Sequence, residues 1–244
     1  MRPSKRNFNQ IRPISIETGI IKNAEGSCKI KCENTEIICT ATVDENVPHF
    51  MRKTGLGWVT AEYGMLPRST NSRMKRESSR GKQGGRTLEI QRLIGRSLRT
   101  CVDRLLLGER QIIIDCDVIQ ADGGTRCAAI TGGWVALKLA ANYLIQNQII
   151  KDDPIINQVA AISCGIFNDE PILDLDYEED SNINTDANFV LNQNNEIIEI
   201  QVSAEKKPFS YEDFEKLFNL SKRGIQELID FQKKAISSVN FSRK

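Results

Sequence analysis

Ile112-Ile-Ile-Asp-Cys-Asp-Val-Ile-Gln-Ala-Asp-Gly-Gly-Thr-Arg126 is the stretch around which this chain is organised. Its β-branched start predicts a buried strand, and apolar side chains recur at helical spacing over residues 127–146. Between strand and helix, the two glycines of segment 122–126 permit positive φ, so that consecutive N–H groups can converge on one point. The pattern therefore predicts a strand, a Gly-Gly turn and a helix in direct succession.

The same turn has the chemistry of an anion site. A helix N-terminus carries partial positive charge, and Thr125 and Arg126 add a hydroxyl and a planar cation that suits phosphate oxygens. Taken alone, the segment slightly favours the alternative, a plain Gly-Gly turn with a surface arginine. The anion site therefore needs support from the rest of the chain.

Composition limits the class of protein. Of the 244 residues, 40% are hydrophobic and 27% are charged, which is typical of a soluble globular protein. The net charge of +1 excludes a global basic bias, so a nucleic-acid partner would have to meet a local patch. The N-terminus has no apolar region typical of a secretory signal, and no apolar run approaches the roughly 18 residues of a membrane span. We expect a cytoplasmic protein without a membrane partner.

Cysteine and histidine usage excludes several kinds of site. Most of the seven cysteines lie inside apolar patterns and none forms a Cys-x-x-Cys pair, which favours reduced core thiols over disulfides or zinc. His49, the only histidine, lies in a polar turn, so a histidine-based nucleophilic triad is poorly supported. Catalysis would have to use carboxylates, cations and backbone donors.

The segment 66–87 is long, polar and basic. Its one acid is Glu77, and its cations are Arg68, Arg73, Lys75, Arg76, Arg80, Lys82 and Arg86. Irregular loops longer than about 15 residues are uncommon in compact domains and are often functional. A solvated flexible loop is the alternative, but the missing acids favour a site that follows the backbone of a polyanion.

Residues 88–106 predict an amphipathic helix. Its core face would carry Ile90, Leu93, Ile94, Leu98, Cys101 and Leu105. Arg92, Arg96 and Arg99 recur at helical spacing and form a cationic stripe, which suits phosphates or acidic partners. Ion pairs at the surface or at a subunit interface are the competing interpretation.

The pattern after residue 150 suggests a second domain. Lys151-Asp-Asp-Pro154 interrupts the chain, so we predict one domain over 1–150 and another over 151–244. Each half has hairpin-like strands followed by helix, which predicts an α/β fold of the α+β type with mostly antiparallel or mixed sheets. The expected strands are 28–32, 37–43, 57–61, 159–167, 172–177, 186–191 and 197–203, and the C-terminal helices are 211–218 and 220–237.

Six carboxylates lie between residues 174 and 186. They are Asp174, Asp176, Glu178, Glu179, Asp180 and Asp186, without the Gly and Glu offsets of an EF-hand. Such a cluster can hold Mg²⁺ through one or two ligands, although most acidic runs are solvated turns. Asp180 and Asp186 flank the loop 181–185, so both can reach the top of neighbouring strands. An anion site, a basic loop and a carboxylate pair are together the parts that phosphoryl chemistry needs.

Several long motifs resemble the ribonuclease PH family. Gly84-Gly-Arg-Thr-Leu-Glu-Ile-Gln-Arg-Leu-Ile-Gly-Arg-Ser-Leu-Arg99 is similar to its signature helix. The other motifs are Gly57-Trp-Val-Thr-Ala-Glu-Tyr63, Met65-Leu-Pro-Arg68, the segment 115–126 and Leu173-Asp-Leu-Asp-Tyr-Glu-Glu-Asp-Ser181. The resemblance runs in order from Arg2 to Gln232.

The resemblance implies a fold, an activity and a set of site residues. The activity would be reversible phosphorolytic 3′→5′ exoribonuclease action on tRNA precursors and possibly rRNA, with inorganic phosphate as co-substrate, in a ring hexamer built as a trimer of dimers. Phosphate would bind Arg86, Gly124, Thr125 and Arg126, and catalysis would use Arg126 with an Mg²⁺-associated pair, Asp180 and Asp186. RNA would contact Arg68, Arg73 and Arg76, and the stripe of Arg92, Arg96 and Arg99 would also follow its backbone.

The chain departs from the family pattern at a few positions. Lys82 replaces a usual arginine, Leu88 replaces a polar residue, and Gln201-Val-Ser-Ala-Glu205 replaces Gln-Gly-Thr-Ala-Glu. Two rival functions are a non-catalytic RNA-binding ring subunit and a metal-dependent hydrolytic nuclease. The first would be expected to lack Asp180, Asp186 or Arg126, and the second would release monophosphates. A P-loop protein is disfavoured because its phosphate-binding motif is absent.

Overall fold

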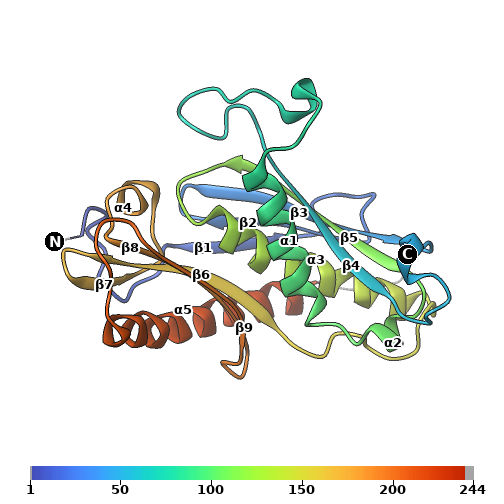
Figure 1. Cartoon of the computed structure of the whole chain (residues 1–244). Coiled ribbons are helices and arrows are strands. Elements are labelled where there is room, and N and C mark those ends of the chain that lie inside the picture. Colours follow the sequence, from blue (N-terminus) through green and yellow to red (C-terminus); the bar gives the residue numbers. More distant parts are fainter. Residues whose placement is uncertain (1, 240–244) are drawn as a thin grey trace.

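The computed structural model of the chain describes residues 2–239 and contains two sheets (Figure 1). The first sheet has the order β1-β2-β3-β5-β4 and the second β7-β6-β8-β9. The strands of the first are β1 (Ile14–Thr18), β2 (Gly26–Cys32), β3 (Thr35–Asp44), β4 (Trp58–Met65) and β5 (Gln111–Gln120). The strands of the second are β6 (Val159–Phe167), β7 (Glu170–Leu173), β8 (Thr185–Asn192) and β9 (Ile197–Ala204).

The helices pack against these sheets. They are α1 (Gly85–Arg99), α2 (Arg104–Leu107), α3 (Thr125–Gln146), α4 (Tyr177–Asp180) and α5 (Tyr211–Ser237). β4 pairs with β5 in parallel, and the other neighbouring strands are antiparallel, so the first sheet is mixed. The predicted α+β class with antiparallel or mixed sheets is confirmed. Strand β1 was not predicted from the sequence.

The strand, turn and helix of the central stretch occur as predicted. Side chains of β5 alternate, with Ile112, Ile114, Cys116 and Val118 in the core. Helix α3 contacts β2, β3 and β5 on one side and β6 on another, so 16 of its 22 residues are buried. Gly132 lets it approach the sheet closely, since an added Cβ would lie 2.8 Å from Ile30. The centre of the fold is therefore a helix enclosed by both sheets.

Helix α3 also corrects the expectation that no run is long and apolar enough to span a membrane. The helix is long and apolar enough by length and composition, because only Arg126 and Lys138 carry charge in it. However, 78% of the apolar window is buried inside the fold. Its apolar character is explained by packing on both sides.

The predicted helix 88–106 is wrong in its second half. Helix α1 ends at Arg99, and Asp103 then caps α2 by accepting the N–H groups of Leu105 and Leu106. The N–H of Asp103 donates to the carbonyl of Pro154, 2.7 Å away, which diverts the chain toward the second half of the protein. Leu105, predicted to be in the core, is 69% exposed.

The C-terminal prediction of two helices is also wrong, because α5 is continuous. Gly224 does not interrupt it, and its missing side chain lets the helix lie on the second sheet, since a Cβ there would be 2.4 Å from Ile162. The predicted capping box of Ser210 and Asp213 is confirmed. The predicted strand 172–177 stops at Leu173, because Asp174 has a φ of +57° and α4 follows.

Candidate active site

The Gly-Gly turn before α3 can be formed only by glycine. Gly123 and Gly124 have φ values of +76° and +65°. An added Cβ at Gly123 would lie 2.6 Å from the carbonyl carbon of Asp176, and one at Gly124 would lie 2.8 Å from Nη2 of Arg12. The turn thus brings the first residues of α3 directly against the segment that begins α4.

Two side chains hold this turn in place. The hydroxyl of Thr35 donates to the carbonyl of Gly123 at 2.8 Å and accepts the N–H of Asp122 at 2.9 Å. Nη1 of Arg12 donates to the carbonyl of Asp122 at 2.7 Å. No side chain of the described residues caps α3, so the N–H groups of its first turn face the pocket that Gly124, Thr125 and Arg126 line.

A pocket of about 340 Å³ brings the predicted phosphate and acidic residues together. It is lined from both sheets and from the basic loop by Met65, Thr70, Met74, Arg86, Ala121, Gly123, Gly124, Thr125, Arg126, Ser163, Tyr177, Asp180, Asp186 and Asn188. All residues predicted for phosphate binding and catalysis are among them. We take this pocket as the candidate active site.

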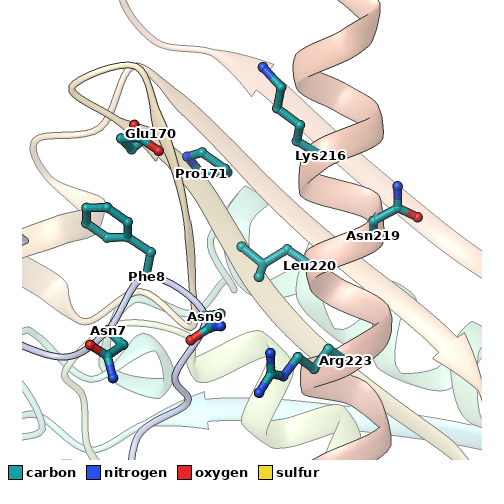
Figure 2. A pocket seen from close by; sticks show the side chains of 9 residues that line it. All are labelled: Asn7, Phe8, Asn9, Glu170, Pro171, Lys216, Asn219, Leu220 and Arg223. Carbon is teal, nitrogen blue, oxygen red and sulfur yellow. The ribbon is translucent and has the colours of Figure 1, made fainter.

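A larger cavity, of about 780 Å³, lies elsewhere, between the N-terminal segment, β7 and α5 (Figure 2). Phe8, Pro171 and Leu220 form its apolar part, and Lys216 and Arg223 point from α5 at its side. It contains no pair of carboxylates and no residue of the Gly-Gly turn. The size of a cavity therefore does not identify the site here, whereas its chemistry does.

Arg126 is held in the pocket by partners from two distant elements. Its Nη1 donates to Oε1 of Gln201 on β9 at 2.6 Å and lies 3.6 Å from Oε1 of Glu89 on α1. Gln201 in turn donates to Glu89 at 3.0 Å. The guanidinium is thus oriented by an amide from strand β9 and a carboxylate from helix α1.

The neighbouring departure from the family pattern is accommodated by regular structure. Val202 follows Gln201 in β9 and pairs with Ala187 of β8. Its partly buried side chain packs against the core of the second sheet. The change from glycine to valine therefore leaves Gln201 in a continuous strand, in position to contact Arg126.

The hydroxyl of Thr125 is oriented by Tyr63, which was not predicted as a site residue. The two hydroxyl oxygens are 2.9 Å apart, and burial raises the pKa of Tyr63. Tyr63 alternates with outward-facing residues in β4 and is 5% exposed. The alternating pattern of residues 57–63 was the only sequence signal for this inward position.

The surroundings of Asp180 and Asp186 in the pocket disfavour the ionisation of both carboxyl groups. Burial, and then the charge of Asp180, raise the pKa of Asp186 to about 6. Burial also raises the pKa of Asp180, against the attraction of Arg86 and Arg126. The side-chain amide of Asn188 donates to both carboxylate oxygens of Asp186 at 3.3 Å. A cation between the acids would relieve their repulsion.

This pair fits Mg²⁺ better than a metal with a full protein cage. Among the described residues, no group of three or more His, Cys, Asp or Glu side chains is placed to hold a metal ion. Mg²⁺ commonly binds one or two carboxylates and completes its octahedron with water and substrate phosphates. Asp180 and Asp186, beside the Gly-Gly turn that was predicted to bind phosphate, fit that donor set.

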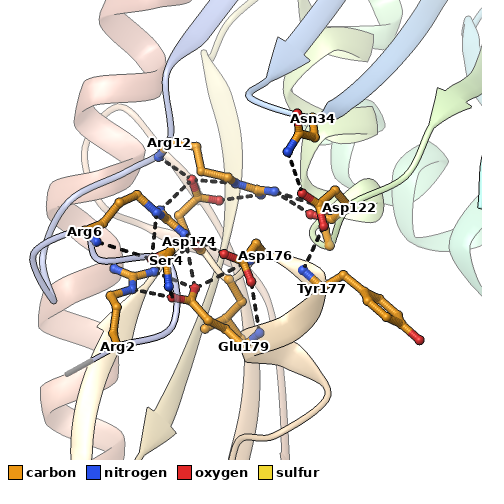
Figure 3. A network of polar contacts seen from close by, with 12 residues as sticks. Arg2, Ser4, Arg6, Arg12, Asn34, Asp122, Asp174, Asp176, Tyr177 and Glu179 are labelled. Atoms are coloured by element: carbon orange, nitrogen blue, oxygen red, sulfur yellow. Dashed lines mark hydrogen bonds and ion pairs between the residues drawn. The ribbon is translucent and has the colours of Figure 1, made fainter. Parts of the chain in front are cut away.

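Three of the other predicted acids, Asp174, Asp176 and Glu179, belong to a network of polar contacts (Figure 3), whereas the fourth, Glu178, is exposed. Arg12 contacts Asp174 through two nitrogens at 3.1 and 2.7 Å, and these contacts lower the pKa of Asp174 despite its burial. Burial would raise the pKa of Glu179, but hydrogen bonds, chiefly from Arg2, lower it to about 2. The sequence carried no signal for these long-range partners. They separate the buried acids Asp174 and Glu179 from the pair Asp180 and Asp186, which lines the pocket.

The predicted RNA-binding arginines of the basic loop lie beside the pocket or project from it. The segment 66–84, between β4 and α1, extends from the body of the molecule (Figure 1), with Arg73 and Arg76 exposed. Arg68 lines a polar cavity of about 640 Å³ that shares Thr70, Met74, Ala121 and Tyr177 with the active-site pocket. Of the three arginines predicted to bind RNA in this loop, Arg68 is thus the one that lines a cavity adjoining the active-site pocket.

The arginine stripe of α1 is not brought into the active site. Arg92, Arg96 and Arg99 line a separate groove of about 420 Å³. Arg96 pairs with Glu199 at 2.9 Å, and Arg99 lies 3.7 Å over the ring of Trp58 and donates to the carbonyl of Val59. Arg92 is exposed. Contact of these three residues with RNA remains a prediction.

Comparison with known proteins gives consistent matches over both sheets. Residues 10–141 match the 3′ exoribonuclease family, domain 1, and residues 157–224 match domain 2 of the same family. A protein named ribonuclease PH from Roseobacter denitrificans is 59% identical over 235 residues, covering 96% of this chain and 99% of the relative. Another, from Caulobacter vibrioides, is 59% identical over 236 residues, covering 97% and 99%.

Solved structures show the same fold at low sequence identity. Rice (Oryza sativa) Rrp46 has a TM-score of 0.78 and 19% identity, covering 96% of this chain and 100% of its own. The Archaeoglobus fulgidus exosome, solved with RNA bound to the active site, has a matching chain with a TM-score of 0.80 and 18% identity, covering 94% and 91%. These likenesses carry information about the fold alone.

Proposed function

The chain belongs to the ribonuclease PH family and is a phosphorolytic 3′→5′ exoribonuclease of the nucleotidyltransferase class, and we propose that its reaction takes place in the pocket of Arg126 and Asp186. One observation supports this placement above all. Arg86, Thr125 and Arg126 converge with Asp180 and Asp186 in a single pocket. A site for an attacking phosphate therefore adjoins one for charge neutralisation.

The residues of the pocket have separate tasks in this proposal. Arg86, Arg126 and the first-turn N–H groups of α3 hold inorganic phosphate in line with the last phosphodiester. An oxygen of the phosphate attacks phosphorus, and the bond to the 3′ oxygen of the preceding nucleotide breaks. The products are a nucleoside diphosphate and a shortened RNA whose 3′ oxygen takes up a proton. Mg²⁺ held by Asp180 and Asp186 would offset negative charge on the transferring group.

The substrate in this proposal is the single-stranded 3′ end of tRNA precursors, and possibly of rRNA. Arg68, Arg73 and Arg76 contact its phosphates without reading sequence. The non-catalytic ring subunit is not favoured, because the three residues that it would lack are all in the pocket. We propose domains of 1–150 and 151–244, whose border lies between the two family matches.

Assembly and location complete the proposal. A ring hexamer, a trimer of dimers, is supported by exposed apolar side chains, including Phe50, Leu105 and Leu106, which suit a subunit interface. A structural neighbour described as an archaeal exosome core has a TM-score of 0.72. The cysteines are all buried and free, which suits the reducing cytoplasm.

The first experiment tests phosphate dependence. A 3′-extended RNA should be shortened only when phosphate is present, and the released nucleotides should be diphosphates, because phosphate is the nucleophile. Products are resolved by charge after reaction with Mg²⁺, with and without phosphate. Equal shortening in phosphate-free buffer, with monophosphate products, would support the hydrolytic alternative.

The basic loop gives a second prediction. Replacing Arg68, Arg73 and Arg76 together with Ala should weaken RNA binding and flatten its dependence on salt by about 2 units of log–log slope, since each single-strand phosphate contact contributes about 0.7. Fluorescence anisotropy over a salt series measures the slope. Replacing the exposed Arg52, Arg223 and Lys233, outside the loop, is the matched control. An equal slope for both variants would show that the loop does not contact RNA.

A further inference from the structure

Tyr177 forms part of the wall between two cavities. It lines both the active-site pocket and the polar cavity of Arg68, which have four residues in common. The side chain is 61% exposed, and its ring points away from the polar network of α4 (Figure 3). None of the aromatic or cation–π contacts among the described residues includes it. An exposed aromatic face thus lies among the four residues that the two cavities share.

The backbone beneath this ring is firmly held. The N–H of Tyr177 donates to Oδ1 of Asp122 at 3.3 Å, which ties it to the Gly-Gly turn. Asp176 caps α4 in a capping box with Glu179, and Arg2 holds Glu179 by two bonds of 2.7 and 2.8 Å. The ring is therefore carried by a segment fixed relative to both the phosphate-binding turn and the acid pair.

The second cavity suits a nucleotide chain. Amides and hydroxyls line it together with Arg68, and its acid, Asp122, is already engaged by Asn34 at 3.1 Å. An RNA whose scissile phosphate lies near Arg126 must pass its adjoining nucleotide over the shared wall to reach this cavity. Every base has a flat face that stacks on an aromatic ring, whatever its identity. A contact that does not depend on the identity of the base suits an enzyme that removes one nucleotide after another.

On these grounds, and resting on the proposed function, we propose that Tyr177 is the stacking platform for the base of a nucleotide next to the scissile phosphodiester. The polar cavity of Arg68 then receives the neighbouring nucleotide. The platform selects RNA with an accessible, unpaired base at its 3′ end without selecting its sequence. Tyr177 acts on the RNA alone, whereas Arg126 acts on the phosphate.

Two substitutions of Tyr177 distinguish the contribution of its aromatic face from that of its hydroxyl. Tyr177→Ala should raise the KM for RNA by about 10-fold or more, the usual effect of losing one base–aromatic stack. Tyr177→Phe should stay within about twofold of the wild type, because the face remains. The half-saturating phosphate concentration should change in neither variant. An equal loss in the Ala and Phe variants would overturn stacking, and an unchanged KM in Tyr177→Ala would remove the residue from the RNA path.

A double-mutant cycle tests the contact itself. RNAs with one abasic nucleotide at the last, the penultimate or the fourth position from the 3′ end are titrated against wild type and Tyr177→Ala in phosphate-free buffer. We expect the wild type to lose about 10-fold in affinity at the last or penultimate position, and the variant to lose little there. Equal losses in both proteins at both positions would contradict the proposal.

Two controls distinguish a failure of the stacking proposal from a failure of the proposed function. Light scattering must show the same assembly for all variants, since loss of assembly in Tyr177→Ala alone would assign the ring to a contact between copies of the chain and overturn the proposal. Wild-type turnover is measured with and without phosphate in the same series. If the wild type needs phosphate and Tyr177→Ala behaves like it, the platform fails while the proposed function stands. If the wild type ignores phosphate, the proposed function fails first.

Discussion

Asp186→Asn is expected to reduce turnover by about 10²- to 10³-fold while leaving RNA binding and assembly nearly intact. The substitution keeps the shape of the side chain and the acceptor for Asn188 but removes the charge that would attract Mg²⁺. The arginines that are proposed to bind RNA lie in other segments, so the affinity for RNA should persist. Initial rates at saturating RNA and phosphate, together with anisotropy and light scattering, measure the three quantities.

A matched control excludes a general effect of lost negative charge. Asp169, at the turn before β7, pairs with Lys207 and is 77% exposed at its side chain, so Asp169→Asn should keep full activity. A fully active and Mg²⁺-responsive Asp186→Asn protein would show that the pair plays no part in catalysis.

The raised pKa of Asp186 also predicts the pH dependence of activity. Because burial and Asp180 raise it to about 6, protons compete with a cation at this carboxylate as the pH falls toward 6. Activity should therefore decline on the acidic side near that pH, and a higher Mg²⁺ concentration should move the decline to lower pH. Rate profiles from pH 5 to pH 8 at two Mg²⁺ concentrations measure the shift; identical profiles would contradict it.

The same shift predicts that Asp186→Asn does not destabilise the fold at neutral pH. The folded-state pKa lies above the ordinary value of 3.8, so folding favours the protonated acid, and this contribution is lost as the pH rises from about 4 through 6. At pH 7.5, Asp186→Asn removes a disfavoured charge, and its thermal midpoint without Mg²⁺ should equal or exceed that of the wild type. A lower midpoint would mean that the ionised carboxylate stabilises the fold.

Arg126→Ala is expected to weaken the apparent phosphate affinity by about 10- to 100-fold. A charge-assisted hydrogen bond of this type contributes roughly 1.5–3 kcal/mol. Turnover should fall further if the same cation also stabilises the transition state. RNA binding should survive, because the basic loop is a separate stretch. A phosphate titration of initial rate measures both effects, with light scattering to confirm the same assembly.

Arg126→Lys tests whether a positive charge alone is sufficient at this position. Gln201 and Glu89 orient a planar guanidinium, and an ammonium group cannot reproduce its paired donors, so Lys should recover little. Unchanged half-saturating phosphate and an unchanged maximum rate for Arg126→Ala in an intact oligomer would remove Arg126 from the site.

Local sequence was sufficient to predict those parts of the fold that depend on residues close together in the chain. Alternation in β5 and the need for positive φ at Gly123 and Gly124 are properties of short segments, and the strand, turn and helix formed as predicted. Helix ends were less predictable. Helix α1 stops at Arg99 because Asp103 caps the next helix and bonds to Pro154, a residue far along the chain.

The candidate site was likewise predictable from the sequence only in part. The residue types of phosphoryl chemistry were evident in the sequence, as were the segments that carry them. Tertiary structure alone decided which carboxylates are free to act, because Asp174 and Glu179 are neutralised by Arg12 and Arg2, more than a hundred residues away. It also decided that Gln201 orients Arg126 and that Tyr63 orients Thr125. Turns and alternation depend on local backbone preference, whereas the pairing of buried charges depends on which distant segments the core brings together.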